Sequence, residues 1–253
     1  MRKRVIPVLL LDRERRLVKT VQFGARTYIG DPFNVVRLFN EKEVDEIVVL
    51  DIDAGPDGRA PDFDFLRELS SECFMPLAYG GGISTMAHCE QLNRLGVEKF
   101  VFGHGAFDRP LISTASRNLG SQAVVVCIDV VGRGADARCT TRSGKQQHDV
   151  HPLHHARAMQ DAGVGEIIVQ SVDRDGRREG MDLELVDAIA HQLDVPVVAL
   201  GGAADLRHLA LALQSGASAV ASGSAFCFVG RLRAVLVTYP SRQELDRALD
   251  GPT

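Results

Sequence analysis

Short apolar runs rich in β-branched residues alternate with longer stretches of helical periodicity along the whole chain. Most of these runs are continuously apolar, as strands covered on both faces must be. The predicted strands span 5–11, 46–52, 76–80, 99–103, 123–130, 166–172, 196–201 and 219–223. Strands that alternate with helices in this way are typical of βα units around a parallel sheet.

The second half of the chain repeats features of the first half at a displacement of 120 residues. The matching pairs are Glu46 and Glu166, Gly81 and Gly201, Gly82 and Gly202, and Gly103 and Gly223. Separated features in one register indicate an internal duplication. We therefore predict an α/β fold, a single (βα)8 TIM barrel domain over 1–253 built from two similar half-barrels, about 1–122 and 123–253. The alternative is an open doubly wound sheet, which does not naturally give two equivalent pairs of glycine-ended strands.

Two connections are longer than a barrel turn requires. The first spans 14–32 and carries Lys19, and the second spans 131–150. Within the second, 137–141 and 145–147 are predicted to form a small hairpin around Ser143-Gly144. Long loops that follow barrel strands usually serve function, so both are expected to cover the ligand-binding face and Lys19 is a candidate catalytic residue.

The composition places the chain among folded proteins and removes several functional classes. Of its 253 residues 45% are hydrophobic and 25% are charged, which is enough to bury a full core. The net charge of -4 gives no electrostatic reason to expect a nucleic acid or an anionic membrane as partner. No apolar run is long enough to span a bilayer or to form a signal peptide, so a cytoplasmic protein is expected. The five cysteines are odd in number and widely spaced, which argues against a disulfide framework or a zinc ribbon.

Glycines end several predicted strands and are followed by helical segments. In this position glycine lets the backbone approach an anion closely, and the amides of the next helix supply donors. The candidate phosphate-binding residues are Gly81, Gly82, Gly103 and His104 in the first half, and Gly201, Gly202, Gly223 and Ser224 in the second. The alternative is that these glycines only permit tight turns. Two such groups in one barrel predict a ligand with a phosphate at each end.

Carboxylates also stand at strand ends, where barrel enzymes place their catalytic groups. Asp129 follows five apolar residues and is the strongest candidate for a general acid or base. Asp51 and Asp175 are further catalytic candidates, although Asp175 could instead belong to a salt-linked turn over 173–176.

Four histidines at 148, 151, 154 and 155 have the look of a metal cluster, since 151 and 155 share a helix face. No carboxylate or cysteine with ligand spacing completes the set. We therefore expect a solvated surface group, with neither a metal nor another cofactor.

In combination these motifs resemble the cyclase subunit of imidazole glycerol phosphate synthase, in the histidine-biosynthesis barrel family. The resemblance covers nearly the whole chain and includes Lys3-Arg4-Val5-Ile6-Pro7, Gly30-Asp31-Pro32, Gly80-Gly81-Gly82-Ile83, Gly120-Ser121-Gln122, Asp173-Arg174-Asp175-Gly176 and Gly201-Gly202-Ala203. It implies a glutaminase partner whose ammonia passes through the barrel to a bisphosphorylated ribonucleotide. The family enzyme then closes an imidazole ring and cleaves off a second nucleotide.

The sequence departs from this family at the reacting centre. The family uses one aspartate at the end of the first strand and one at the end of the fifth, and Asp129 matches the second. Leu10 stands at the first, and leucine cannot carry a proton. Asp12 is the nearest carboxylate, yet it lies about 6.6 Å further along an extended strand. Gly103 and His104 replace the family's asparagine and threonine.

The family's ammonia gate is retained, with Arg4, Glu46, Lys99 and Glu166 at the matching positions. The alternative for four scattered charges is a solvated rim whose ion pairs contribute little. Phe74-Met75-Pro76 and Tyr239-Pro240-Ser241 resemble a paralogous branch that works with a glutaminase and a separate sugar amidotransferase in making surface polysaccharides. Two hypotheses follow: an ammonia-conducting subunit without cyclase activity, or a genuine lyase of histidine biosynthesis that uses Asp129 and a substitute base.

Overall fold

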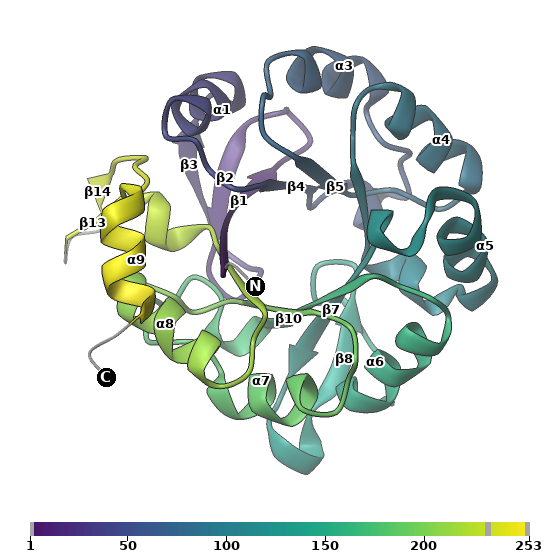
Figure 1. Cartoon of the computed structure of the whole chain (residues 1–253). Coiled ribbons are helices and arrows are strands. Elements are labelled where there is room, and N and C mark those ends of the chain that lie inside the picture. Colours follow the sequence, from purple (N-terminus) through teal and green to yellow (C-terminus); the bar gives the residue numbers. More distant parts are fainter. Residues whose placement is uncertain (1–2, 231–233, 251–253) are drawn as a thin grey trace.

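A computed structural model describes residues 3–230 and 234–250 of the chain. Eight parallel strands form a closed barrel ringed by helices (Figure 1). The barrel strands, in spatial order, are β1 (Arg4–Leu11), β4 (Ile47–Asp51), β5 (Leu77–Gly80), β6 (Lys99–Phe102), β7 (Val124–Val131), β10 (Glu166–Ser171), β11 (Val197–Leu200) and β12 (Ala219–Ser222). The pairing of β12 with β1 closes the ring. The predicted (βα)8 barrel and its eight strands are confirmed, and the open sheet is excluded.

The helices pack their apolar stripes on the outside of this barrel. They are α1 (Pro32–Glu41), α2 (Ala54–Asp57), α3 (Phe63–Ser71), α4 (Met86–Arg94), α5 (Arg109–Leu119), α6 (Pro152–Asp161), α7 (Leu183–Ala190), α8 (Leu206–Gln214) and α9 (Arg242–Asp250). Side chains such as Asp31, Asp62 and Thr85 cap their N-termini by accepting a backbone amide hydrogen bond. Short 3-10 turns follow several strands, among them η1 (His104–Phe107) after β6.

The internal repeat is visible in the element boundaries. The bounds of β1 and β7, of α1 and α6, and of α4 and α8 each differ by 120 residues. Details of the turns repeat as well, since His88 Nδ1 accepts the amide of Ser84 and His208 Nδ1 accepts the amide of Ala204. The two halves therefore share local geometry as well as sequence. The division at about 122 and 123 stays a prediction.

The barrel lumen is apolar. Aliphatic side chains from all eight strands form an inner cluster that is separate from the larger core between strands and helices. Its buried members are Ile6, Val8, Val48, Ala78, Val101, Val125, Ile168, Val198, Leu200, Ala219 and Ala221. Leu10, Leu50 and Cys127 pack against this cluster on the C-terminal side. Every barrel strand thus contributes at least one aliphatic side chain to the lumen.

Two hairpins extend over the C-terminal ends of the strands. The predicted hairpin is confirmed as β8 (Arg138–Thr141) and β9 (Gln146–Gln147). A second hairpin, β2 (Leu17–Thr20) with β3 (Arg26–Gly30), occupies the long loop after β1, where no strands were predicted. A short pair, β13 (Phe228–Val229) and β14 (Ala234–Val235), precedes α9. Among the described residues no helix is both long and apolar enough to cross a membrane.

Candidate functional site

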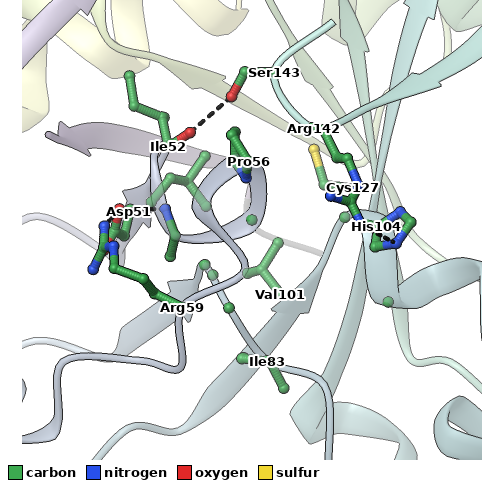
Figure 2. Close-up of a pocket in the computed structure, with 18 of the residues that line it drawn as sticks. Asp51, Ile52, Pro56, Arg59, Ile83, Val101, His104, Cys127, Arg142 and Ser143 are labelled. Atoms are coloured by element: carbon green, nitrogen blue, oxygen red, sulfur yellow. Dashed lines mark hydrogen bonds and ion pairs between the residues drawn. The ribbon is translucent and has the colours of Figure 1, made fainter. Parts of the chain in front are cut away.

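A cavity of about 590 Å³ opens at the C-terminal ends of the barrel strands (Figure 2). Its floor is formed by Leu10, Leu50, Val101 and Cys127, which come from four different strands. Loops after β4, β5 and β6 and the tip of the β8–β9 hairpin form its walls. This is the face on which barrel enzymes place their active sites, so we treat the cavity as the candidate site.

Asp129 projects into this cavity from β7. Burial raises the pKa of its carboxyl to about 7, and the nearby Asp175 carboxylate adds to the increase. The Cys127 thiol, 3.5 Å from Asp129 Oδ1, donates a hydrogen bond that acts in the opposite direction. A carboxyl with a pKa near neutrality can both accept and release a proton, as a general acid or base must.

Leu10 lines the same cavity, in the position that the resemblance assigns to the other catalytic aspartate. Asp12 does not replace it. Its side chain lies outside the cavity and accepts hydrogen bonds from the backbone amides of Glu14 and Arg16 and from the Arg16 guanidinium at 2.9 Å. Burial opposes ionisation of Asp12, but the bonds from Arg16 prevail and lower its pKa. Asp12 therefore holds the β1–β2 turn together and does not face a ligand.

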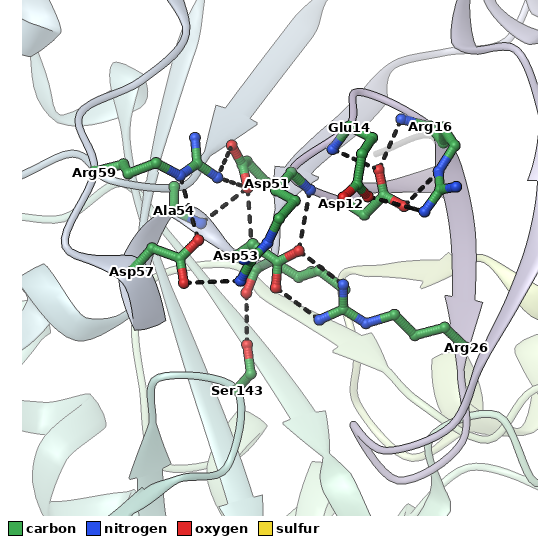
Figure 3. A network of polar contacts seen from close by, with 12 residues as sticks. Asp12, Glu14, Arg16, Arg26, Asp51, Asp53, Ala54, Asp57, Arg59 and Ser143 are labelled. Atoms are coloured by element: carbon green, nitrogen blue, oxygen red, sulfur yellow. Dashed lines mark hydrogen bonds and ion pairs between the residues drawn. The ribbon is translucent and has the colours of Figure 1, made fainter.

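Asp51, at the end of β4, is held by the turn that follows it (Figure 3). Its Oδ1 accepts the amides of Asp53 and Ala54 at 3.0 and 2.9 Å, and Arg59 lies 3.3 Å away. Burial raises the pKa of Asp51, although these bonds and Arg59 oppose the increase. Asp51 lines the cavity, so it stays available as a catalytic candidate.

The β2–β3 hairpin is tied down on both sides of the mouth. Arg26 forms two hydrogen bonds of 2.7 Å with the Asp53 carboxylate (Figure 3). Across the mouth, Thr20 Oγ1 donates to Asp175 Oδ2 at 2.7 Å. Asp175 thus contacts β2 and does not line the cavity, whereas Thr20 does.

Lys19 belongs to β2 of the same hairpin, and its side chain is buried. Its ammonium donates to the carbonyl oxygen of Val8, and its tip packs against Gly223. Burial lowers the pKa of Lys19, with Cys227 and Asp175 acting in the other direction. Lys19 therefore lies at the second predicted phosphate group rather than in the cavity with Asp129.

The two predicted phosphate groups differ in their surroundings. Gly81, Gly82, Gly103 and His104 line the cavity, whereas Gly201, Gly202, Gly223 and Ser224 do not. Both halves also need glycine for close packing. A Cβ on Gly82 would meet the carbonyl oxygen of Arg59, and one on Gly202 would meet that of Gly180. Close packing thus accounts for these two glycines, and phosphate binding stays a prediction for both groups.

At the opposite end of the barrel the four predicted gate residues form a closed ring of ion pairs. Arg4 contacts Glu46 at 2.7 Å and also contacts Glu166. Lys99 lies 2.8 Å from Glu46 and 3.0 Å from Glu166. The carboxylate side chains are only 5% and 8% exposed, so these pairs are far better shielded than a solvated rim. The geometry is that of a plug at the N-terminal end of the lumen.

The histidine group is different from what the sequence suggested. His155 is buried, and both His155 and His148 stack on the Phe107 ring, with centroids 4.3 and 4.0 Å away. The expected solvated surface is therefore wrong for His155, because Phe107 reaches it from the turn after β6. Burial lowers the pKa of His155 to about 4. No group of potential metal ligands was found among the described residues.

Sequence reasoning missed several polar cavity residues, among them Arg142, Cys127 and Gln170. Arg142 precedes the Ser143-Gly144 turn. The sequence does not show which way this turn points, so it could not place the Arg142 side chain at the cavity. Cys127 and Gln170 each occupy the inward face of a strand, and the strand period of two relates Cys127 to Asp129. That period was the available signal for Cys127.

Comparisons with known proteins agree over nearly the full length. Residues 4–232 match the family described as histidine biosynthesis protein. A Pseudomonas aeruginosa protein, provisionally named imidazole glycerol phosphate synthase subunit hisF2, is 46% identical over 248 residues, covering 97% of this chain and 98% of the relative. A Vibrio vulnificus protein, provisionally named subunit hisF3 of the same enzyme, is 41% identical over 254 residues, covering 99% and 97%. The imidazole glycerol phosphate synthase subunit HisF of Frankia casuarinae is 36% identical over 235 residues, covering 91% and 92%.

Proposed function

The chain belongs to the histidine biosynthesis protein family, and from this premise we propose that it is a subunit that conducts ammonia without catalysing the family's cyclisation. In this role it receives ammonia from a glutaminase at the charged ring and delivers it at the cavity. The resemblance to the family implies the route that the ammonia takes. The departures from the family imply that the chain does not catalyse cyclisation.

The apolar lining of the lumen supports this proposal. Neutral ammonia loses its hydrogen bonds to water in an apolar passage, but this cost is far smaller than that of burying an ammonium ion there. The lumen is lined by aliphatic side chains from all eight strands, and the ring of Arg4, Glu46, Lys99 and Glu166 stands at its N-terminal end. Passage requires one ion pair of the ring to open. Arg4 and Lys99, with 24% and 21% of their side chains exposed, are the members that a partner surface can reach.

The observation that argues against cyclase activity is the presence of Leu10 in the cavity. Cyclisation in the family relies on an acid and a base on opposite strands. This cavity offers Asp129 on β7 and an alkyl side chain on β1. Asp12, the substitute considered from sequence, is bound to Arg16 and lies outside the cavity.

Delivered ammonia then needs another acceptor. The resemblance to the polysaccharide branch suggests a separate sugar amidotransferase that docks at the cavity mouth. The two relatives with the provisional names match more of this chain than the Frankia synthase subunit does, which is consistent with such a branch. A cytoplasmic location for the complex belongs to the same proposal.

A second candidate is a genuine cyclase of histidine biosynthesis. The pKa of Asp129, raised to about 7, favours it, since that value suits a general acid or base at neutral pH. In this case Asp51, which also lines the cavity, is the carboxylate placed to act with Asp129.

Turnover of the family's bisphosphorylated ribonucleotide with ammonium as nitrogen source separates the two candidates. A positioned acid or base contributes about 10²- to 10⁴-fold to rate, so we expect the wild-type chain near background. Leu10→Asp should recover only part of the activity, because Gly103 and His104 also differ from the family. Robust wild-type turnover would overturn the proposal. A separate assay asks whether the glutaminase encoded in the same genome binds the chain and is activated by it. If the glutaminase neither binds the chain nor is activated by it, the proposed route for ammonia is wrong.

A further inference from the structure

A second carboxyl lies near Asp129, and the charges of the two interact. Asp129 lines the cavity from β7, whereas Asp175 follows the short 3-10 turn η4 (Val172–Arg174) after β10 and lies outside the cavity lining. Burial raises the pKa of both carboxyls, and the charge of Asp175 raises the pKa of Asp129 further. Two like charges in one buried site oppose each other, so one carboxyl keeps its proton longer than the other. The groups around each carboxyl decide which one this is.

Asp175 is surrounded by groups that favour its charged form. Thr20 Oγ1 donates to Asp175 Oδ2 at 2.7 Å. The backbone amide of Phe23 and the side-chain amide of Gln170 also donate to this carboxylate, and the ammonium of Lys19 adds a favourable charge. Each of these groups stabilises the ionised carboxylate and so acts against the effect of burial on its pKa.

Asp129 has much weaker support for a negative charge. Among the described residues its only hydrogen-bond donor is the Cys127 thiol, 3.5 Å from Oδ1, and a thiol is a weak donor. Burial and the neighbouring Asp129 raise the pKa of this thiol well above its ordinary value, so the thiol keeps its proton. Cys139, on the neighbouring strand β8, is likewise neutral, because burial raises its pKa to about 12. These surroundings favour the proton on Asp129 and the charge on Asp175.

Gln170 lies between the two carboxyls. It is opposite Asp129 in the register of β10 with β7, and both side chains line the cavity. The Gln170 side chain is buried, and its Oε1 lies 4.0 Å from the Cys127 sulfur. Because a carboxylate only accepts hydrogen bonds, the NH2 group of Gln170 faces Asp175 and its oxygen faces the thiol. The amide is therefore oriented by its neighbours on both sides.

We propose that Gln170 is a positioning residue that places the negative charge of this carboxyl pair on Asp175 and the proton on Asp129. Its NH2 group stabilises the charge outside the cavity, and it offers no donor to the carboxyl inside the cavity. Asp129 therefore enters the neutral pH range still able to give up a proton to a ligand. The inference goes beyond the proposed function, since this division of charge holds whether or not ammonia crosses the barrel.

Carbon-13 NMR of the aspartate carboxyls in the full chain tests the proposal, with Asp129→Asn and Asp175→Asn identifying the two signals. Gln170→Met keeps the length of the side chain and removes the amide. We expect the pKa of Asp175 to rise and that of Asp129 to fall, by on the order of 1 pH unit, because Asp175 loses a donor and then repels a charge on Asp129 less. A general loss of polarity around the pair would raise both values. That result, or no change in either value, would overturn the proposal.

A double variant tests whether Gln170 acts through Asp175. In an Asp175→Asn background the substitution Gln170→Met should no longer lower the pKa of Asp129, because the charge that Gln170 stabilises is gone. An equal fall in both backgrounds would show that Gln170 acts on Asp129 directly, and the proposal would be wrong.

Cys127 provides a comparison of opposite sign. Cys127→Ala removes the donor to Asp129 and should raise its pKa, and Cys127→Ser, which restores a donor, should reverse the increase. If Cys127→Ala lowered the pKa as Gln170→Met does, both changes would reflect a general disturbance of the site, which would contradict the proposal. Cys89→Ala, at a buried thiol of α4 outside the cavity, is the matched control, and thermal unfolding checks that each variant stays folded. Loss of glutaminase coupling with these pKa values as expected would count against the proposed function alone.

Discussion

Leu10 and Asp129 line one cavity from opposite parts of the barrel, and only Asp129 can exchange a proton. The carboxyl of Asp129 has its pKa raised to about 7 by burial, while the Leu10 side chain packs against the apolar lumen. The two strand positions that hold the family's acid and base therefore supply one proton-exchanging group here. A second proton transfer would have to come from another cavity residue such as Asp51.

The Asp129 carboxyl should make the folding free energy depend on pH. Its pKa is raised from 3.8 in the unfolded chain to about 7 in the folded one, so the folded state binds more protons between these values and stability falls as pH rises through them. Asp129→Asn should remove this slope, and should stabilise the chain by about 2 kcal/mol at pH 8 relative to wild type after allowance for solvent screening. Denaturant unfolding at pH 5 and pH 8 measures it. Asp64→Asn, on an 83% exposed side chain, should leave the slope intact.

The charged ring should respond to reversal of one member. Lys99→Glu places a third carboxylate beside Glu46 and Glu166, which repel it and are left with Arg4 as their only remaining cation of the ring. We expect the barrel to stay folded with a loss of about 2 kcal/mol, and glutaminase activation to fall sharply. Lys99→Met separates lost attraction from added repulsion. Normal activation in Lys99→Glu would show that the ring takes no part in coupling.

The β2–β3 hairpin should loosen when its anchor is removed. Arg26→Ala breaks two hydrogen bonds to Asp53, so amide hydrogen exchange over 17–30 should become faster while exchange in the barrel strands is unchanged. Arg37→Ala breaks the exposed pair with Glu72 and provides the control. Equal exchange rates in the hairpin of Arg26→Ala and wild type would mean that the other contacts, such as the pairing of β2 with β1 and the bond from Thr20 to Asp175, hold the hairpin without Arg26.

Gly82 should tolerate no side chain. Its φ is +71°, and a Cβ there would collide with the backbone carbonyl of Arg59, so Gly82→Ala should destabilise the chain by about 2 kcal/mol or more. Gly55→Ala is the matched control, because nothing lies within 4 Å of the added carbon. Unfolding midpoints of both variants give the comparison.

The barrel was predictable because its signals are local and repeated. Continuous apolar runs identified the eight strands, and the shift of 120 residues related the two halves. The β2–β3 hairpin escaped prediction because its two strands are short and each carries a charged residue, Lys19 or Arg26. Its strands form because β2 pairs with the extended end of β1, a contact that the segment's own composition does not reveal.

The site was predictable only where sequence position fixes the side chain. Asp129 and Asp51 follow buried strands, so their place at the cavity could be inferred. Lys19 and Asp175 do not line the cavity, because the Lys19 side chain contacts the Val8 carbonyl oxygen and Asp175 contacts Thr20 of β2; these tertiary contacts cannot be inferred from sequence position. The burial of His155 depends in the same way on Phe107, which is distant in sequence.

The charged ring also breaks the two-fold relationship of the barrel. Arg4, Glu46 and Lys99 come from the first half, and only Glu166 comes from the second; the residues that the repeat pairs with Arg4 and Lys99 are Val124 and Ala219. A half-turn about the pseudo-symmetry axis therefore does not reproduce the charges. A protein that binds this end of the barrel therefore contacts a charge distribution without two-fold symmetry. Two docking orientations related by the half-turn would contact a similar backbone but different charges.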